Sequence, residues 1–168
     1  AKHSRELNIL TVAIITAEDS VDKLTELEQC ADSLIAISDK NSVQINESVL
    51  DIVQGISDLI TQQGLIGFDF ADAKSVLQNA GRSFVGVGAA AGVNRAKDAT
   101  EKAVSCFNGI GLVSAGGILV NISAESMEIK EFDEVGNIVH DLASENSTIK
   151  IGITEGESLG NAIKVTII

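Results

Sequence analysis

Residues 64–77 read Gly-Leu-Ile-Gly-Phe-Asp-Phe-Ala-Asp-Ala-Lys-Ser-Val-Leu, and the rest of the chain is organised around this turn. Apolar residues at helical spacing precede it, and a second helix begins inside it. Asp69 and Asp72 stand three residues apart, on one side of the first turn of that second helix. A carboxylate there can accept hydrogen bonds from unpaired N–H groups, so capping is one interpretation of both aspartates. Presentation of negative charge at a surface is the other.

The chain after this turn predicts a layered α/β unit. We expect helices over residues 71–80, 92–104 and 130–143, and strands over residues 83–87, 116–124, 148–153 and 162–168. Gly81 is expected to end the first of these helices, because glycine is a common stop signal. The inward face of the second helix should carry Ala96, Ala99, Ala103 and Val104.

The chain before the turn predicts a parallel crossover unit. Residues 8–15 and 33–37 are apolar runs rich in β-branched residues, which is typical of buried strands. Residues 21–31 carry apolar side chains at helical spacing between them. Strand, helix and strand in this order form a parallel pair. Residues 39–46 read as a polar loop, and residues 47–61 as a helix with a wide apolar face.

Composition narrows the function classes. The 168 residues have the length of one compact unit, and no apolar run reaches the ~18 residues that a membrane span needs. The opening segment does not resemble a secretory signal. The net charge of −12 argues against sequence-independent binding to nucleic acid, which relies on clustered lysine and arginine. We therefore expect no nucleic-acid partner and no membrane insertion.

Single reactive residues give weak signals. Cys30 and Cys106 are too few for a disulfide framework or a zinc site, and their apolar surroundings predict buried thiols. His140 is expected at the surface of a helix, with no metal ligands near it. Arg95 begins a helix and is expected to be a structural ion-pair partner rather than a phosphate ligand. We predict no metal site in this chain.

Residues 86–92, Gly-Val-Gly-Ala-Ala-Ala-Gly, partly mimic a dinucleotide fingerprint. The third glycine comes one position too late, and no acidic residue follows at the end of a strand about 20 residues further on. A tight strand-to-helix turn is the preferred interpretation. A small α/β enzyme using this turn is kept as an alternative, and nothing in the chain matches a P-loop.

The turn at residues 64–77 resembles the synergy loop of FtsZ, the bacterial tubulin relative that polymerises and hydrolyses GTP. The family pattern is Asn-x-Asp-x-x-Asp, in a context like Gly-Leu-Ile-Asn-x-Asp-Phe-Ala-Asp-Val. Similar segments continue on both sides, and they read Gln-Gly-Ile-Ser-Asp-Leu-Ile (54–60), Gly-Val-Asn-Arg-Ala (92–96), Gly-Ile-Leu-Val-Asn-Ile (117–122), Glu-Phe-Asp-Glu-Val-Gly-Asn (131–137) and Ile-Lys-Val-Thr-Ile-Ile (163–168). The resemblance covers nearly all of residues 52–168 and, more loosely, residues 1–37.

The resemblance implies a fold and a role. The fold would be α/β, a layered sheet with flanking helices of the FtsZ/tubulin C-terminal-domain type. Residues 1–46 would be a strand-helix-strand remnant of the nucleotide domain, residues 47–61 a shortened central helix, and residues 62–168 the C-terminal domain. Asp69 and Asp72 would activate GTP hydrolysis on the adjacent subunit of a head-to-tail filament, with Mg²⁺ accompanying the nucleotide. The expected location is the cytoplasm, at the division site.

Two departures from the family pattern shape that expectation. The chain contains no Gly-Gly-Gly-Thr-Gly-Thr-Gly run, so we expect it to bind no GTP and to hydrolyse none by itself. Gly67 stands where the family's loop has asparagine, while both aspartates are retained. The chain would then be the activating half of a polymerising GTPase. The alternative is a stand-alone module that binds and caps FtsZ filaments without catalysis.

Overall fold

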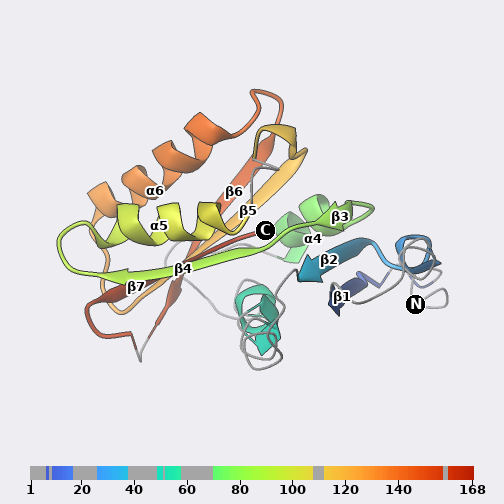
Figure 1. The fold of residues 1–168 in the computed structure, drawn as a ribbon, viewed down its shortest axis with the longest axis horizontal. Coiled ribbons are helices and arrows are strands. Elements are labelled where there is room, and N and C mark those ends of the chain that lie inside the picture. The colour runs from blue at the N-terminus through green and yellow to red at the C-terminus, as the bar shows by residue number, and fades with distance from the viewer. Residues whose placement is uncertain are drawn as a thin grey trace.

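A computed structural model of the chain describes residues 7, 9–16, 26–37, 49–50, 52–57, 70–107, 112–156 and 159–168. Asp69, Gly67 and the predicted polar loop at residues 39–46 lie outside the described residues. So do parts of the helices expected over residues 21–31 and 47–61. Within the described part, the chain forms two β-sheets with helices packed on them (Figure 1).

The first sheet contains three parallel strands in chain order: β1 (Val12–Thr16), β2 (Ser33–Ile37) and β3 (Gly81–Ser83). Parallel pairing of β1 with β2 confirms the predicted crossover, and residues 26–28 between them are helical. The carboxylate of Asp32 accepts the backbone N–H of Thr11 at 2.9 Å, which ties the start of β2 to β1. The hydroxyl of Ser33 donates to that of Ser83 at 2.8 Å and ties β2 to β3.

The second sheet contains the four strands expected in the second half of the chain: β4 (Gly86–Ala91), β5 (Gly117–Ala124), β6 (Thr148–Glu155) and β7 (Ala162–Ile167). Their order across the sheet is β4-β7-β5-β6. The last strand, β7, lies between β4 and β5 and is antiparallel to both, while β5 and β6 are parallel. The C-terminal strand therefore closes the centre of the sheet (Figure 1).

Helices α5 (Arg95–Ser105) and α6 (Ile129–Leu142) cover one face of the second sheet (Figure 1). Because side chains alternate along a strand, every second residue of the central strands points at these helices. The buried aliphatic core on this face consists of Ile118, Val120, Ile122, Val135, Val139, Ile163, Val165 and Ile167. Ala96, Ala99 and Ala103 of α5 are buried in the same core, as predicted, and Val104 is partly buried against it.

Two glycines bring α5 into backbone contact with β4. Gly86 and Gly88 lie inside the strand, so the interpretation of residues 86–92 as a strand-to-helix turn is wrong. A Cβ atom at Gly86 would lie 2.0 Å from the carbonyl oxygen of Ala103, and one at Gly88 would lie 2.1 Å from that of Ala99. Only glycine fits at such distances. The glycines therefore serve helix packing, and a dinucleotide loop has no structural basis here.

The opposite face of the second sheet is more polar. The hydroxyl of Thr154 donates to Oδ1 of Asn121 at 3.2 Å, so the hydroxyl of Ser123 donates in turn to Thr154 at 2.9 Å. Helical residues 52–57 pack against this face, where a Cβ atom at Gly55 would meet the side chain of Thr166 at 3.0 Å.

The strand predicted over residues 83–87 is wrong in its bounds. β3 ends at Ser83, and β4 begins at Gly86. Between them the chain passes from the first sheet to the second, with Phe84 packed against one hydrophobic core and Val85 against others. An alternating pattern shows where a chain is extended, but it does not show that the chain changes sheets.

Candidate functional site

Helix α4 (Phe70–Leu77) carries the part of the sequence-predicted site that the structure describes. Its buried residues, Ala73 and Leu77, pack on Leu119 of β5 and on the C-terminal residue Ile168. The helix ends three residues earlier than expected because Asn79 adopts φ 57°, a left-handed conformation that asparagine tolerates. The side of α4 away from the sheet therefore remains at the surface.

Asp72 lies in the first turn of α4, and its Oδ1 atom forms an ion pair with Nζ of Lys150 at 2.8 Å. The side chains of Asp72 and Lys150 are 35% and 39% exposed, respectively. A carboxylate in a first turn is also favoured by the positive end of the helix dipole. Asp69 lies outside the described residues, so the structure places one of the two predicted carboxylates, at a half-exposed position.

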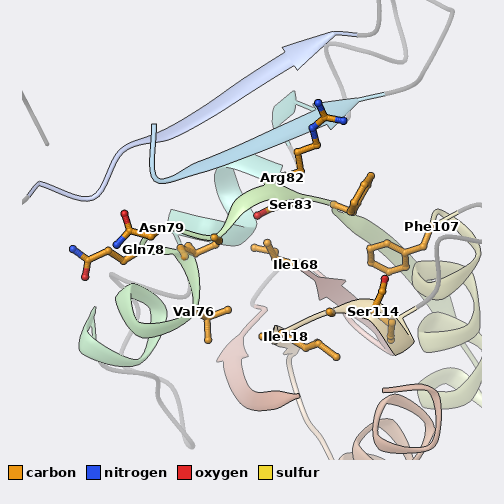
Figure 2. Close-up of a pocket in the computed structure, with 16 residues that line it drawn as sticks. Val76, Gln78, Asn79, Arg82, Ser83, Phe107, Ser114, Ile118 and Ile168 are labelled. Carbon is orange, nitrogen blue, oxygen red and sulfur yellow. The ribbon is translucent and has the colours of Figure 1, made fainter. Parts of the chain in front are cut away.

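Behind α4 lies a cavity of about 390 Å³, between the end of this helix, β3 and the start of β5. Figure 2 shows Val76, Ile118 and Ile168 around its centre, with Phe107 and Ser114 at the opposite wall. Gly117 allows α4 to approach β5, since a Cβ atom there would lie 2.7 Å from the side chain of Val76.

Arg95 is the structural ion-pair partner that the sequence predicted. Its guanidinium binds both carboxylate oxygens of Glu131, at 2.6 and 2.9 Å, and donates to the carbonyl oxygens of Ser126 and Asn161. The hydrogen bonds from Arg95 lower the pKa of Glu131 below its usual range, and burial acts in the opposite direction. This cluster joins α5, α6 and the β6–β7 connection, at the end of the sheet far from α4.

Other candidate residues take no part in a site. Cys106 is exposed and Cys30 is partly exposed, so the prediction of two buried thiols is wrong: neither position lies in the core that its sequence neighbours suggest. His140 is exposed on α6, as expected. Across the described ranges, no three His, Cys, Asp or Glu side chains gather as a metal site. In the same ranges, no helix combines the length and apolar character of a membrane span.

Two sheets, helices on both faces of the second, and an antiparallel last strand between parallel neighbours define an α/β protein of the FtsZ/tubulin C-terminal-domain type. A family model described as "FtsZ family, C-terminal domain" matches residues 81–168, about half of the chain. The chain belongs to the FtsZ family.

Relatives support this assignment along the whole chain. The cell division protein FtsZ of Buchnera aphidicola subsp. Baizongia pistaciae is 34% identical over 198 residues, which cover 100% of this chain and 51% of the relative. FtsZ of Pseudomonas aeruginosa is 32% identical, and the match covers 100% of this chain and 50% of that relative. The chain thus spans about half the length of the curated relatives that it matches.

Solved structures agree with the fold. An FtsZ mutant from M. jannaschii superposes with a TM-score of 0.86 at 28% identity, over 99% of this chain and 57% of that one. The structure "FtsZ dimer, empty (M. jannaschii)" superposes with a TM-score of 0.84 at 29% identity, over 99% of this chain and 56% of that one. TubZ of Bacillus thuringiensis serovar israelensis, in GDP-form protofilaments, superposes with a TM-score of 0.61 at 12% identity, over 97% of this chain and 54% of that one. This similarity shows a shared fold alone.

Sequence reasoning missed Lys150, the ion-pair partner of Asp72. The signal available was a single lysine within the strand Thr-Ile-Lys-Ile-Gly-Ile-Thr-Glu, β6, where apolar residues flank it on both sides. A charged residue inside such a strand needs a partner or solvent. Nothing in the sequence shows that the partner comes from α4, because strand and helix are separated by 70 or more residues.

Proposed function

We propose that this chain acts as the C-terminal, activating half of a tubulin-like GTPase that assembles head to tail into cell-division filaments. In this proposal Asp69 and Asp72 approach the GTP held by the adjacent subunit. Membership of the FtsZ family supports the role. The observation that carries the site is the position of Asp72, at the first turn of a helix that is anchored by its other face.

The chemistry follows from that position. Phosphoryl transfer to water depends mainly on positioning and on stabilising charge, so a carboxylate near the γ-phosphate can orient the attacking water. Assembly would then create the complete active site and switch hydrolysis on. In this proposal Mg²⁺ accompanies the nucleotide of the neighbouring subunit. The setting would be the cytoplasm, at the division site.

The domain boundaries form part of the same proposal. Residues 1–46 are assigned to the edge of a nucleotide domain, residues 47–61 to a shortened central helix and residues 62–168 to the C-terminal domain. Contact between α4 and β5 supports placing α4 with the last unit. β3, which this division assigns to the last unit, pairs with β2 of the first unit.

The second candidate function is a non-catalytic module that caps FtsZ filaments. It rests on the 168 residues containing no Gly-Gly-Gly-Thr-Gly-Thr-Gly run. A subunit with an activating face and no nucleotide face would join one end of a filament and stop growth there. A gene that encodes such a run upstream would exclude this candidate, whereas an open reading frame limited to these residues would favour it.

The test adds this chain in increasing amounts to a full-length FtsZ relative, while GTP turnover and filament mass are followed together. We expect both to change, and we expect Asp69→Ala with Asp72→Ala to abolish the change in turnover. The matched control is Asp98→Ala with Glu101→Ala, two exposed acidic residues with the same spacing on α5. No effect of the wild-type chain at large excess would mean that only the fold is shared.

A further inference from the structure

We propose that Lys150 is a positioning residue for the activating carboxylate, which it orients and whose charge it offsets as Asp72 approaches the neighbour's γ-phosphate. This inference rests on the proposed function, because it assigns a second residue to the same trans-acting site. The observation behind it is the 2.8 Å contact between Lys150 Nζ and Asp72 Oδ1.

The sheet register brings Lys150 to α4. In the parallel pairing of β5 with β6, Lys150 lies opposite Leu119, the residue on which Ala73 of α4 packs. The two flanking residues of β6, Ile149 and Ile151, pack against the core under α5 and α6. Lys150 therefore points to the α4 face of the sheet, where Asp72 lies one position before the buried Ala73.

Stability does not explain the pair. Both side chains are more than a third exposed, and ion pairs with such exposure contribute about 0–1 kcal/mol. By contrast, Arg95 and Glu131 are 12% and 11% exposed, two hydrogen bonds join them, and Arg95 donates two more to backbone carbonyl oxygens. Lys150 lies among apolar residues of its strand and contacts an aspartate in the first turn of α4. Its effect on the surface charge around Asp72 explains this placement better than stability does.

Electrostatics supply that reason. A bare carboxylate that approaches a triphosphate is repelled, by roughly 1–4 kcal/mol per pair of unit charges at 4 Å near a protein surface. With its ammonium 2.8 Å from Asp72, Lys150 makes the pair neutral overall. The contact through Oδ1 also restricts rotation of the carboxylate, which matters because positioning supplies most of the catalysis in phosphoryl transfer.

The test uses a reporter: a full-length FtsZ relative in which the two aspartates at the matching positions are alanine, so that stimulated turnover depends on the chain that is added. The full chain is added as wild type, Lys150→Met, Lys150→Arg and Lys97→Met. Lys97 is the matched control, because it is an exposed lysine in an ion pair with Glu101 on α5, away from α4. Maximal turnover and the half-saturating concentration are measured for each variant.

We expect Lys150→Met to lower maximal turnover by about tenfold and to change the half-saturating concentration by less than about threefold, as for a group that acts in the transition state. Lys150→Arg should keep more than about half of the turnover, because arginine retains the charge and can reach a carboxylate. With Asp72→Asn already present, Lys150→Met should have no further effect on turnover, since both residues act as one unit.

The outcomes separate this inference from the function on which it rests. No stimulation by the wild-type chain overturns both. Stimulation that Lys150→Met leaves unchanged or increases overturns the role of Lys150 alone, and an increase would show that the lysine restrains Asp72. Equal losses in Lys150→Met and Lys150→Arg, or a loss seen only in the half-saturating concentration, also overturn the positioning role.

Discussion

The two faces of the second sheet are built differently. On one face, α5 and α6 pack on aliphatic residues, two glycines bring α5 into backbone contact with β4, and Arg95 binds Glu131 in a pair that is 12% and 11% exposed. On the other face, α4 packs through a small core, borders a cavity of about 390 Å³ and presents the half-exposed pair of Asp72 and Lys150. The first arrangement stabilises the fold. The second leaves a pair of charged groups partly exposed at the surface.

The largest effect should come from Arg95→Met. The change leaves the Glu131 carboxylate nearly buried and without its cation, which typically costs about 3–5 kcal/mol. Urea denaturation of the purified chain measures the loss in the free energy of unfolding. The control, Arg82→Met, removes an arginine whose side chain is 63% exposed in its ion pair with Glu28, and should cost less than about 1 kcal/mol. Similar losses in both variants would contradict the structural role assigned to the nearly buried pair of Arg95 and Glu131.

Gly88→Ala should have the next largest effect. A Cβ atom 2.1 Å from the Ala99 carbonyl oxygen forces α5 away from β4, and such overpacking costs about 1–3 kcal/mol. The matched variant is Gly116→Ala, at a position where a Cβ atom meets nothing within 4 Å. Thermal unfolding followed by circular dichroism compares the two. A smaller shift for Gly88→Ala than for Gly116→Ala would show that α5 does not lie on β4 as described.

Acid should weaken the face under α5 and α6. Hydrogen bonds from Arg95 lower the pKa of Glu131, so its contribution to stability is present above the ordinary glutamate pKa of about 4.3 and is lost as pH falls through the lowered value. In unfolding experiments from pH 7 downward, the stability difference between wild type and Glu131→Gln should shrink below that point. Glu101→Gln, which removes an exposed carboxylate on α5, is the matched control. A difference that grows in acid would contradict the assignment.

The smallest stability effect should come from Lys150→Met. The ion pair with Asp72 is exposed, so the free energy of unfolding should fall by less than about 1 kcal/mol. A double-mutant cycle with Asp72→Asn should give a coupling energy in the same range. Coupling of several kcal/mol would make the pair part of the architecture, like that of Arg95, and would remove the reason to assign it to function.

Local patterns predicted most elements of the fold. β5 and β7 are rich in aliphatic and β-branched residues, and α5 has alanines at helical spacing, so these local patterns predicted all three within a few residues. The bounds failed where tertiary structure decides. Ser83 ends a strand of the first sheet, and Gly86 begins a strand of the second. The need for glycine at positions 86 and 88 is explained only by the close approach of α5, which follows later in the chain.

The site was predicted only in part. Asp72 was identified because a motif of two aspartates is local in sequence, whereas Lys150 required the register between β5 and β6 and the packing of α4 across it. Arg95 is predicted to be a structural cation from its place at a helix start, yet its partners come from α6 and from two connections remote in sequence. Cys106 is likewise exposed because it caps the C-terminal end of α5, a position that its apolar neighbours in sequence do not reveal.

GTP turnover by reporter subunits that lack their own loop aspartates, measured with and without this chain, tests whether Asp69 and Asp72 are activating groups. We predict that the wild-type chain restores turnover and that the chain with Asp69→Ala and Asp72→Ala does not, although both bind the reporter equally in sedimentation. Turnover restored equally by both chains, or by neither while both bind, would contradict the assignment of these carboxylates as the activating groups.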